Sequence, residues 1–143
     1  MAGAFAPLSL RLPGGEGAPR AARAAVRARL RDQVTPGLVG DVALVVSELV
    51  ANSVRHAEVG PAGFVRLDLR VLGGEVWIAV GDRGSSQLPR ITPREPEASG
   101  GLGLRVVERL ARSWGVARDG AGRTLVWCRL ALDPAGDGGL SRA

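Results

Sequence analysis

Apolar and polar residues alternate in the middle of the chain with a period of two, which is typical of β-strands. Valine or leucine occupies every second position of residues 65–71, and valine or isoleucine every second position of residues 76–80. Gly73 and Gly74 stand between these segments and predict a hairpin with a two-residue turn. Asp82 has the parity of the apolar positions in the second strand. We therefore expect its carboxylate on the face of the sheet that helices cover.

A helical spacing precedes the hairpin, in a segment that begins near Pro19, a residue suited to a first helical turn. One side of this helix carries Ala22, Ala25, Val26 and Leu30, and the other carries Arg20, Arg23, Arg27 and Arg31. Spacings of three and four place the arginines on a common face. We expect this face to be solvated, with a protein-binding face as the alternative.

A second helix is expected from about Pro36 to Ala57, and it is apolar nearly all the way round, as a buried helix is. One narrow polar line interrupts it, formed by Asp41, Glu48, Asn52 and His56. Because buried polar groups need partners, this line is expected to face a cavity or a ligand. Asp82 is expected to face the same cavity.

Three further strands complete the expected sheet: Ala4–Leu12 at an edge, then Trp114–Arg118 and Arg123–Leu132 near the end of the chain. In the last strand Thr124 shares a face with three apolar residues, Val126, Cys128 and Leu130. This parity points Thr124 toward the cavity of Asp82. Cys128 lies in an apolar run, so it is interpreted as a buried structural thiol.

Residues 83–99 show no periodicity and contain three prolines, which is typical of a functional lid. The run Gly100-Gly101-Leu102-Gly103-Leu104 follows and opens a helix that is expected to reach about Ser113. A glycine-rich helix start offers free backbone N–H groups and a positive helix end, and both attract phosphate. The run alone is a weak signal of a nucleotide site.

The chain contains no lysine, which excludes a Walker A phosphate loop, and residues 93–99 are no strand, which excludes the dinucleotide fingerprint. A nucleotide site here must therefore balance phosphate charge with magnesium and backbone groups. Asn52 offers a neutral oxygen of the kind that magnesium accepts. Glu48, one turn earlier, can accept a proton from a water or hydroxyl nucleophile.

Three segments now resemble known motifs, in the correct order. Ser47–Ala57 looks like the N box of the gyrase, Hsp90, histidine kinase and MutL superfamily, and Val80–Gly84 and Gly100–Leu104 look like its first and second glycine boxes. The match covers roughly residues 7–132 and is most similar to small stand-alone anti-sigma-factor serine/threonine kinases and their actinomycete relatives. The sequence departs from the usual first glycine box at Ser86, where the family has a second glycine.

The resemblance implies an α+β fold of the Bergerat ATP-binding type, a two-layer sandwich. In this fold a mixed, mostly antiparallel sheet is covered on one face by about three helices. It also implies a role for each matching residue. Glu48 would be the general base, Asn52 the Mg²⁺ ligand, and Asp82 the acceptor for the adenine amino group. Gly84 would let the backbone approach the base, Gly101, Leu102, Gly103 and Leu104 would lie along the triphosphate, and Thr124 would hold the adenine edge through water.

Each of these residues also has a purely structural interpretation when it is taken singly. Glu48 can be a satisfied core carboxylate, Asp82 a turn former, and the glycines a helix entry. His56 matches a family position and can also be stabilised by the dipole at a helix C-terminus. The combination of three ordered motifs is what favours the ATP site.

The implied function is an ATP-dependent serine/threonine kinase that phosphorylates an anti-anti-sigma (STAS-type) protein, with a sigma factor as a further partner and a homodimer left open. The alternative is a non-catalytic module in which ATP orders residues 83–99 and alters a partner surface. Histidine autophosphorylation is disfavoured, because the chain has one histidine and no phospho-acceptor domain.

Composition changes this picture little. A chain of 143 residues with 45% hydrophobic content has the size of one domain, expected at residues 1–132 with a flexible tail at 133–143. We expect no signal peptide, no membrane span and a cytoplasmic location. The net charge of +5 comes from arginine alone and only weakly favours nucleic-acid binding, since there is no aromatic interleaving or nucleic-acid motif.

Overall fold

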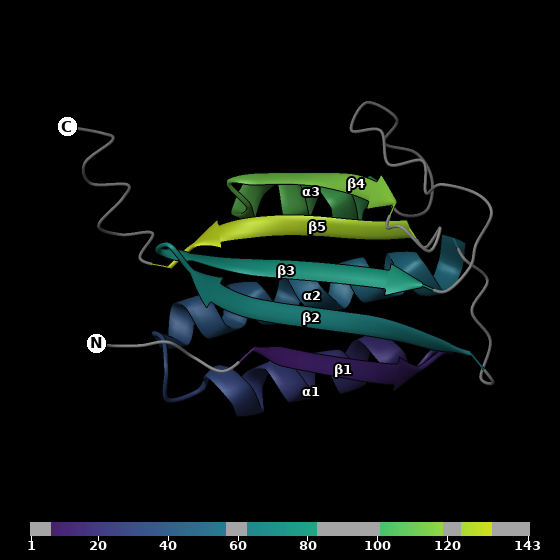
Figure 1. The fold of residues 1–143 in the computed structure, drawn as a ribbon, viewed down its shortest axis with the longest axis horizontal. Helices are drawn as coiled ribbons and strands as arrows, with labels where there is room; N and C mark the ends of the chain where they lie inside the picture. The colour runs from purple at the N-terminus through teal and green to yellow at the C-terminus, as the bar shows by residue number, and fades with distance from the viewer. Residues whose placement is uncertain (1–6, 57–62, 83–100, 119–123, 133–143) are drawn as a thin grey trace.

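A five-stranded sheet with three helices on one face forms the domain (Figure 1). The computed structural model describes residues 7–56, 63–82, 101–118 and 124–132. Its elements are β1 (Leu8–Pro13), α1 (Ala18–Leu30), α2 (Pro36–His56), β2 (Phe64–Leu72), β3 (Glu75–Asp82), α3 (Gly101–Leu110), β4 (Ser113–Arg118) and β5 (Thr124–Ala131). The strand order is β1-β2-β3-β5-β4, and all four strand pairings are antiparallel. The expected α+β two-layer fold is confirmed.

The β2–β3 hairpin forms at the glycine pair, as the alternation predicts. Gly73 and Gly74 have φ angles of 62° and 77°, a left-handed conformation at both central positions that matches the twist of the flanking strands. The register pairs Leu72 with Glu75 and continues to Val65 opposite Asp82. The turn therefore fixes which β3 residues face the helices.

The core lies between the sheet and the helices. Fully or nearly fully buried side chains alternate along the strands and recur at helical spacing on α1 and α2; they include Val65, Leu67, Leu69, Val76, Ile78, Val80, Ala22, Val26, Leu30, Val42, Val46 and Leu49. Both periodicities seen in the sequence thus converge on one core cluster. The arginines of α1 lie outside it.

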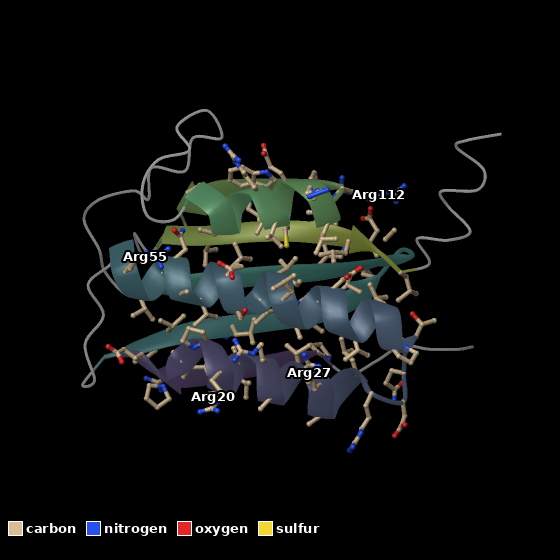
Figure 2. All side chains as sticks on the ribbon, turned by 180° about the vertical axis from the view of Figure 1, so that it is seen from behind. Arg20, Arg27, Arg55 and Arg112 are labelled. Atoms are coloured by element: carbon tan, nitrogen blue, oxygen red, sulfur yellow. The ribbon has the colours of Figure 1, made fainter. Side chains whose placement is uncertain are left out.

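The helix α2 is the central helix of this layer and packs between α1 and α3 (Figure 2). Its segment Pro36–Arg55 is long and apolar enough to cross a membrane by length and composition, but 61% of its most apolar window is buried inside the domain. It is therefore the core helix of the fold. The sequence suggests that α2 is buried nearly all the way round, and on one side this prediction is wrong. Leu44 is 41% exposed there, on a stripe that also includes Gly37 and Arg55.

Several expected boundaries differ from the structure, among them the end of the last strand, at Ala131 instead of Leu132. The third helix ends at Leu110 instead of continuing to about Ser113, because Ser113 already begins β4. The backbone N–H of Arg112 donates to the carbonyl of Arg129 on β5 at 2.7 Å, so the sheet ladder replaces the helix at this point. The first strand begins at Leu8 among the described residues and extends to Pro13, one residue past its expected end.

Candidate functional site

Four element ends meet at one end of the domain, the right-hand end in Figure 1. They are the C-terminal end of α2, the last residue of β3, the first residue of β5 and the start of α3. The antiparallel pairing of β3 with β5 requires the end of the first strand to lie beside the beginning of the second. The segments that sequence motifs single out are thus brought together by the topology.

Asn52 is a buried polar residue in the last turns of α2, near this end. It is 2% exposed, and within the described part of the chain neither its Oδ1 nor its Nδ2 has a hydrogen-bond partner. Leaving a buried amide unpaired costs about 1–3 kcal/mol, and native structures contain few such groups. An orphaned amide at the meeting point of four element ends indicates a ligand that pairs with it.

Other buried polar groups on the same helix do not share this condition. Ser47 is 5% exposed, and its Oγ donates to the carbonyl of Leu44 at 3.1 Å, so the hydroxyl is satisfied within the helix. Ser53 is buried beside Asn52, but it is not among the described side chains left without a partner. The unpaired state is specific to the asparagine that the polar line singles out.

Glu48 lies one helical turn before Asn52 and is half-buried, so its carboxylate remains accessible from outside the core. At 100° per residue, both side chains lie on the flank of α2 opposite Val39, which borders α1. Because α2 lies between α1 and α3 (Figure 2), that flank is the one toward α3. Glu48 and Asn52 therefore face the side where α3 begins.

Asp82 and Thr124 occupy matching ends of neighbouring strands. Asp82 is the last residue of β3, and Thr124 is the first residue of β5. The register pairs Val80 with Val126 and Gly81 with Leu125, so Asp82 and Thr124 come next to each other along the same two strands. Each lies two residues from a buried residue of its own strand, Val80 or Val126, and so belongs to the helix-covered face of the sheet. Their side chains lie outside the described positions, and their contacts stay predictions.

The glycine run falls at the start of α3, which begins at Gly101. Gly101 to Leu104 form its first turn, whose N–H groups have no partner within the helix and suit an anion. The side chains of Leu102 and Leu104, and of His56 at the last position of α2, are not described. Gly84 and residues 83–99 lie outside the described residues, so the lid and the approach of Gly84 to the base stay predictions.

Cys128 is the buried thiol that the sequence predicts. It is fully buried on β5, and burial raises the pKa of its thiol to about 12. The thiol therefore stays protonated near neutral pH and is no nucleophile. Among the described residues no group of three or more histidine, cysteine or acidic side chains is placed to hold a metal.

Comparison with known proteins identifies the family. The model of the histidine kinase-like ATPase domain matches residues 16–129, and the chain belongs to this family. Membership implies ATP binding. The comparison with curated proteins finds no match.

Two solved structures are similar. The histidine kinase domain from the Erythrobacter litoralis EL346 blue-light activated histidine kinase is 29% identical with a TM-score of 0.52, and covers 67% of this chain and 45% of that chain. A structure of the Erythrobacter litoralis EL346 blue-light activated histidine kinase is 23% identical with a TM-score of 0.60. The match covers 87% of this chain and 43% of that chain. The second likeness concerns the fold alone. The chain spans less than half the length of either protein.

Proposed function

We propose that this chain is an ATP-dependent serine/threonine protein kinase of the anti-sigma type, which transfers the γ-phosphate of ATP to a hydroxyl of an anti-anti-sigma (STAS-type) partner. The observation that carries the proposal is the buried, unpaired amide of Asn52 one turn after the accessible carboxylate of Glu48. Binding of ATP follows from the family. The carboxylate of Glu48 adds a general base, which phosphoryl transfer from ATP to a hydroxyl requires.

Asn52 fits the role of a magnesium ligand. Its Oδ1 is a neutral oxygen with no partner among the described residues, and magnesium is bound by few protein oxygens together with phosphate oxygens and waters. When bound, magnesium supplies positive charge that balances the phosphate oxygens. With no lysine in the chain, arginines and backbone N–H groups are the remaining sources of positive charge.

Glu48 is placed to act on the acceptor hydroxyl. Its half-buried position admits a partner side chain, whereas a fully buried carboxylate would not. Glu48 accepts the hydroxyl proton as the serine or threonine oxygen forms its bond to the γ-phosphorus. The bond between that phosphorus and the β–γ bridging oxygen breaks, and ADP leaves with the electron pair.

The other predicted residues bind the nucleotide. Asp82 accepts a hydrogen bond from the adenine amino group, which selects adenine over guanine, and Thr124 beside it holds the same edge of the base through water. Gly84 lets the backbone approach the base. The first turn of α3, from Gly101 to Leu104, lies along the triphosphate, where its free N–H groups are directed at anions.

The partner class rests on the resemblance to stand-alone anti-sigma kinases. A sigma factor is the second expected partner, and a homodimer is consistent with relatives of this size. The cytoplasm is the expected location. We propose no direct contact with nucleic acid or membrane, since the apolar helix α2 is the core helix of the domain.

Phosphoryl transfer is tested by incubating the full chain with radiolabelled ATP, magnesium and purified STAS-type proteins encoded near its gene. The expected result is label on a serine or threonine of one of these proteins, lost on adding a chelator. Asn52→Ala is the matched variant and should lose both ATP binding and transfer. If the wild-type chain binds ATP and labels none of the partners, the kinase proposal is wrong and the binding-module alternative replaces it.

A further inference from the structure

The exposed face of α1, taken together with its C-cap residue Arg31, consists of two parallel rows of side chains. One row is basic and contains Arg20, Arg27 and Arg31, and the other is small and contains Ala21, Ala24 and Ala28; all six residues are exposed. Arg27 and Arg31 are four residues apart, so their guanidinium groups extend from neighbouring turns of one helix face. Large side chains are absent between the rows.

These arginines form no ion pair among the described residues, although Asp32 directly follows Arg31 in the sequence. The helix α1 contains no aspartate or glutamate, and none of the ion pairs among the described residues involves Arg20, Arg27 or Arg31. Other arginines are used differently: Arg112 and Arg129 bind Glu75, and Arg66 binds Asp68. The α1 face therefore carries a net positive charge, which attracts a carboxylate-bearing partner.

A groove lies beside this face, between the C-terminal half of α1 and the N-terminal end of α2. Its volume is about 560 Å³, and its lining is Ala24, Arg27, Ala28, Arg31, Pro36 and Val39. Four of these lining residues are apolar, and the other two are arginines. The groove is separated from Asn52 by the length of α2 from Val39, roughly 20 Å at 1.5 Å per residue. It is thus distinct from the candidate ATP site.

We propose that this α1–α2 groove binds an acidic amphipathic helix of a partner protein. Small residues at Ala24 and Ala28 let a second helix approach closely, since the distance between packed helices depends on the side chains at the contact. Carboxylates at i and i+4 of the incoming helix then pair with Arg27 and Arg31, where guanidinium groups bind carboxylates in bidentate fashion. Apolar side chains of the same helix cover Val39 and Pro36.

A protein helix fits this groove better than a nucleic acid does. Nucleic-acid surfaces combine arginines with aromatic platforms or with a helix that enters the major groove. The rows on α1 contain no aromatic residue, and the groove is lined by two arginines together with apolar residues. The proposal is independent of phosphoryl transfer, because no residue of the groove belongs to the candidate site.

The probe is a fluorescein-labelled helical peptide with glutamates at i and i+4 beside leucines on one face. Fluorescence anisotropy with the full chain should show saturable binding that weakens as ionic strength rises. A peptide with glutamine in place of glutamate should bind about tenfold more weakly or not at all. Double-stranded DNA that carries the same fluorescein label serves as the alternative probe.

Two variants and one control locate the binding. The double variant Arg27→Glu/Arg31→Glu should lose at least about tenfold in peptide affinity, and Ala28→Trp should lose a similar factor by filling the groove. Arg70→Glu changes an exposed arginine on the uncovered face of the sheet and should leave affinity unchanged. Unchanged ATP affinity in all three variants shows that they are folded.

Chemical-shift changes on titrating the peptide should concentrate on residues 24–39. Absence of peptide binding, equal binding by Arg27→Glu/Arg31→Glu and wild type, or shift changes confined to other surfaces would each overturn the proposal. Tighter binding of the DNA than of the peptide, with the same dependence on Arg27 and Arg31, would assign the surface to nucleic acid and overturn it as well.

Discussion

Arg129 on β5 donates a hydrogen bond from Nη1 to Oε1 of Glu75 on β3, at 3.1 Å. The other carboxylate oxygen of Glu75 accepts from Arg112 Nη1 at 3.2 Å, just after α3. Arg129 also donates from Nε to Ser113 Oγ at 2.8 Å and lies over the ring of Trp77. A single carboxylate thus joins the β2–β3 hairpin, the last strand and the end of α3.

We expect Glu75→Gln to lower the free energy of unfolding by about 1–3 kcal/mol, because the Glu75 side chain is only 11% exposed and accepts two charge-assisted hydrogen bonds. Urea denaturation measures the change. Glu108→Gln is the control, since this exposed residue of α3 has no ion pair among the described residues, and it should change stability by less than about 0.5 kcal/mol. Equal losses in the two variants would show that the cluster contributes nothing specific.

Asn52→Leu should raise the stability of the nucleotide-free protein by about 1–2 kcal/mol, because an apolar side chain removes the penalty of a buried amide without partners. The same variant should lose magnesium-dependent ATP binding, measured by calorimetry. A variant that gains stability but loses ATP binding would show that Asn52 serves ligand binding and not folding. A fall in stability would mean that Asn52 supports the fold, and retained affinity would remove its role in the site.

Glu48→Gln should keep ATP affinity within about threefold and lose phosphoryl transfer by about 10²-fold or more, because the amide cannot accept the hydroxyl proton. Calorimetry and transfer of radiolabel to the STAS-type partner measure the two properties. Asp41→Gln, at another position of the polar line, is the matched control and should retain transfer. Normal turnover by Glu48→Gln would remove the general-base role.

Gly115→Ala should destabilise the protein by about 1–2 kcal/mol, since a Cβ at this position on β4 would lie 2.8 Å from Cζ2 of Trp127. Displacement of the indole should also shift the tryptophan fluorescence. Gly40→Ala on α2 meets nothing within 4 Å and should stabilise the protein by about 0.5–1 kcal/mol. The two glycines therefore respond with opposite signs to the same added methyl group, and thermal denaturation separates them.

The elements with strong periodicity were predictable from the sequence, and the reason is visible in the packing. The hairpin follows from its alternation and from Gly73 and Gly74, whose positive φ angles the turn requires. The polar line on α2 predicted a ligand-facing asparagine, and Asn52 is buried without a partner among the described residues. Local patterns of this kind report burial directly, because burial selects residue type at each position.

Features that depend on distant pairs were not predictable in the same way. The Glu75–Arg129 pair requires the β3–β5 register, which no local pattern specifies. The end of α3 depends on the hydrogen bond from Arg112 to the backbone of Arg129, so the helix stops before its apolar spacing does. The groove beside α1 arises from the packing of two helices, whereas the sequence indicates only the arginine face.

If ATP pairs with the orphaned amide of Asn52, we expect nucleotide supply also to affect how much of this domain is folded. A ligand that binds only the native state shifts the folding equilibrium by mass action, and ATP at a hundred times its dissociation constant adds about 2.7 kcal/mol. The folded fraction, and with it resistance to proteolytic turnover, should then follow the ATP level. We therefore expect the stability of this ATP-binding domain to fall when the ATP concentration falls, whichever partner it has.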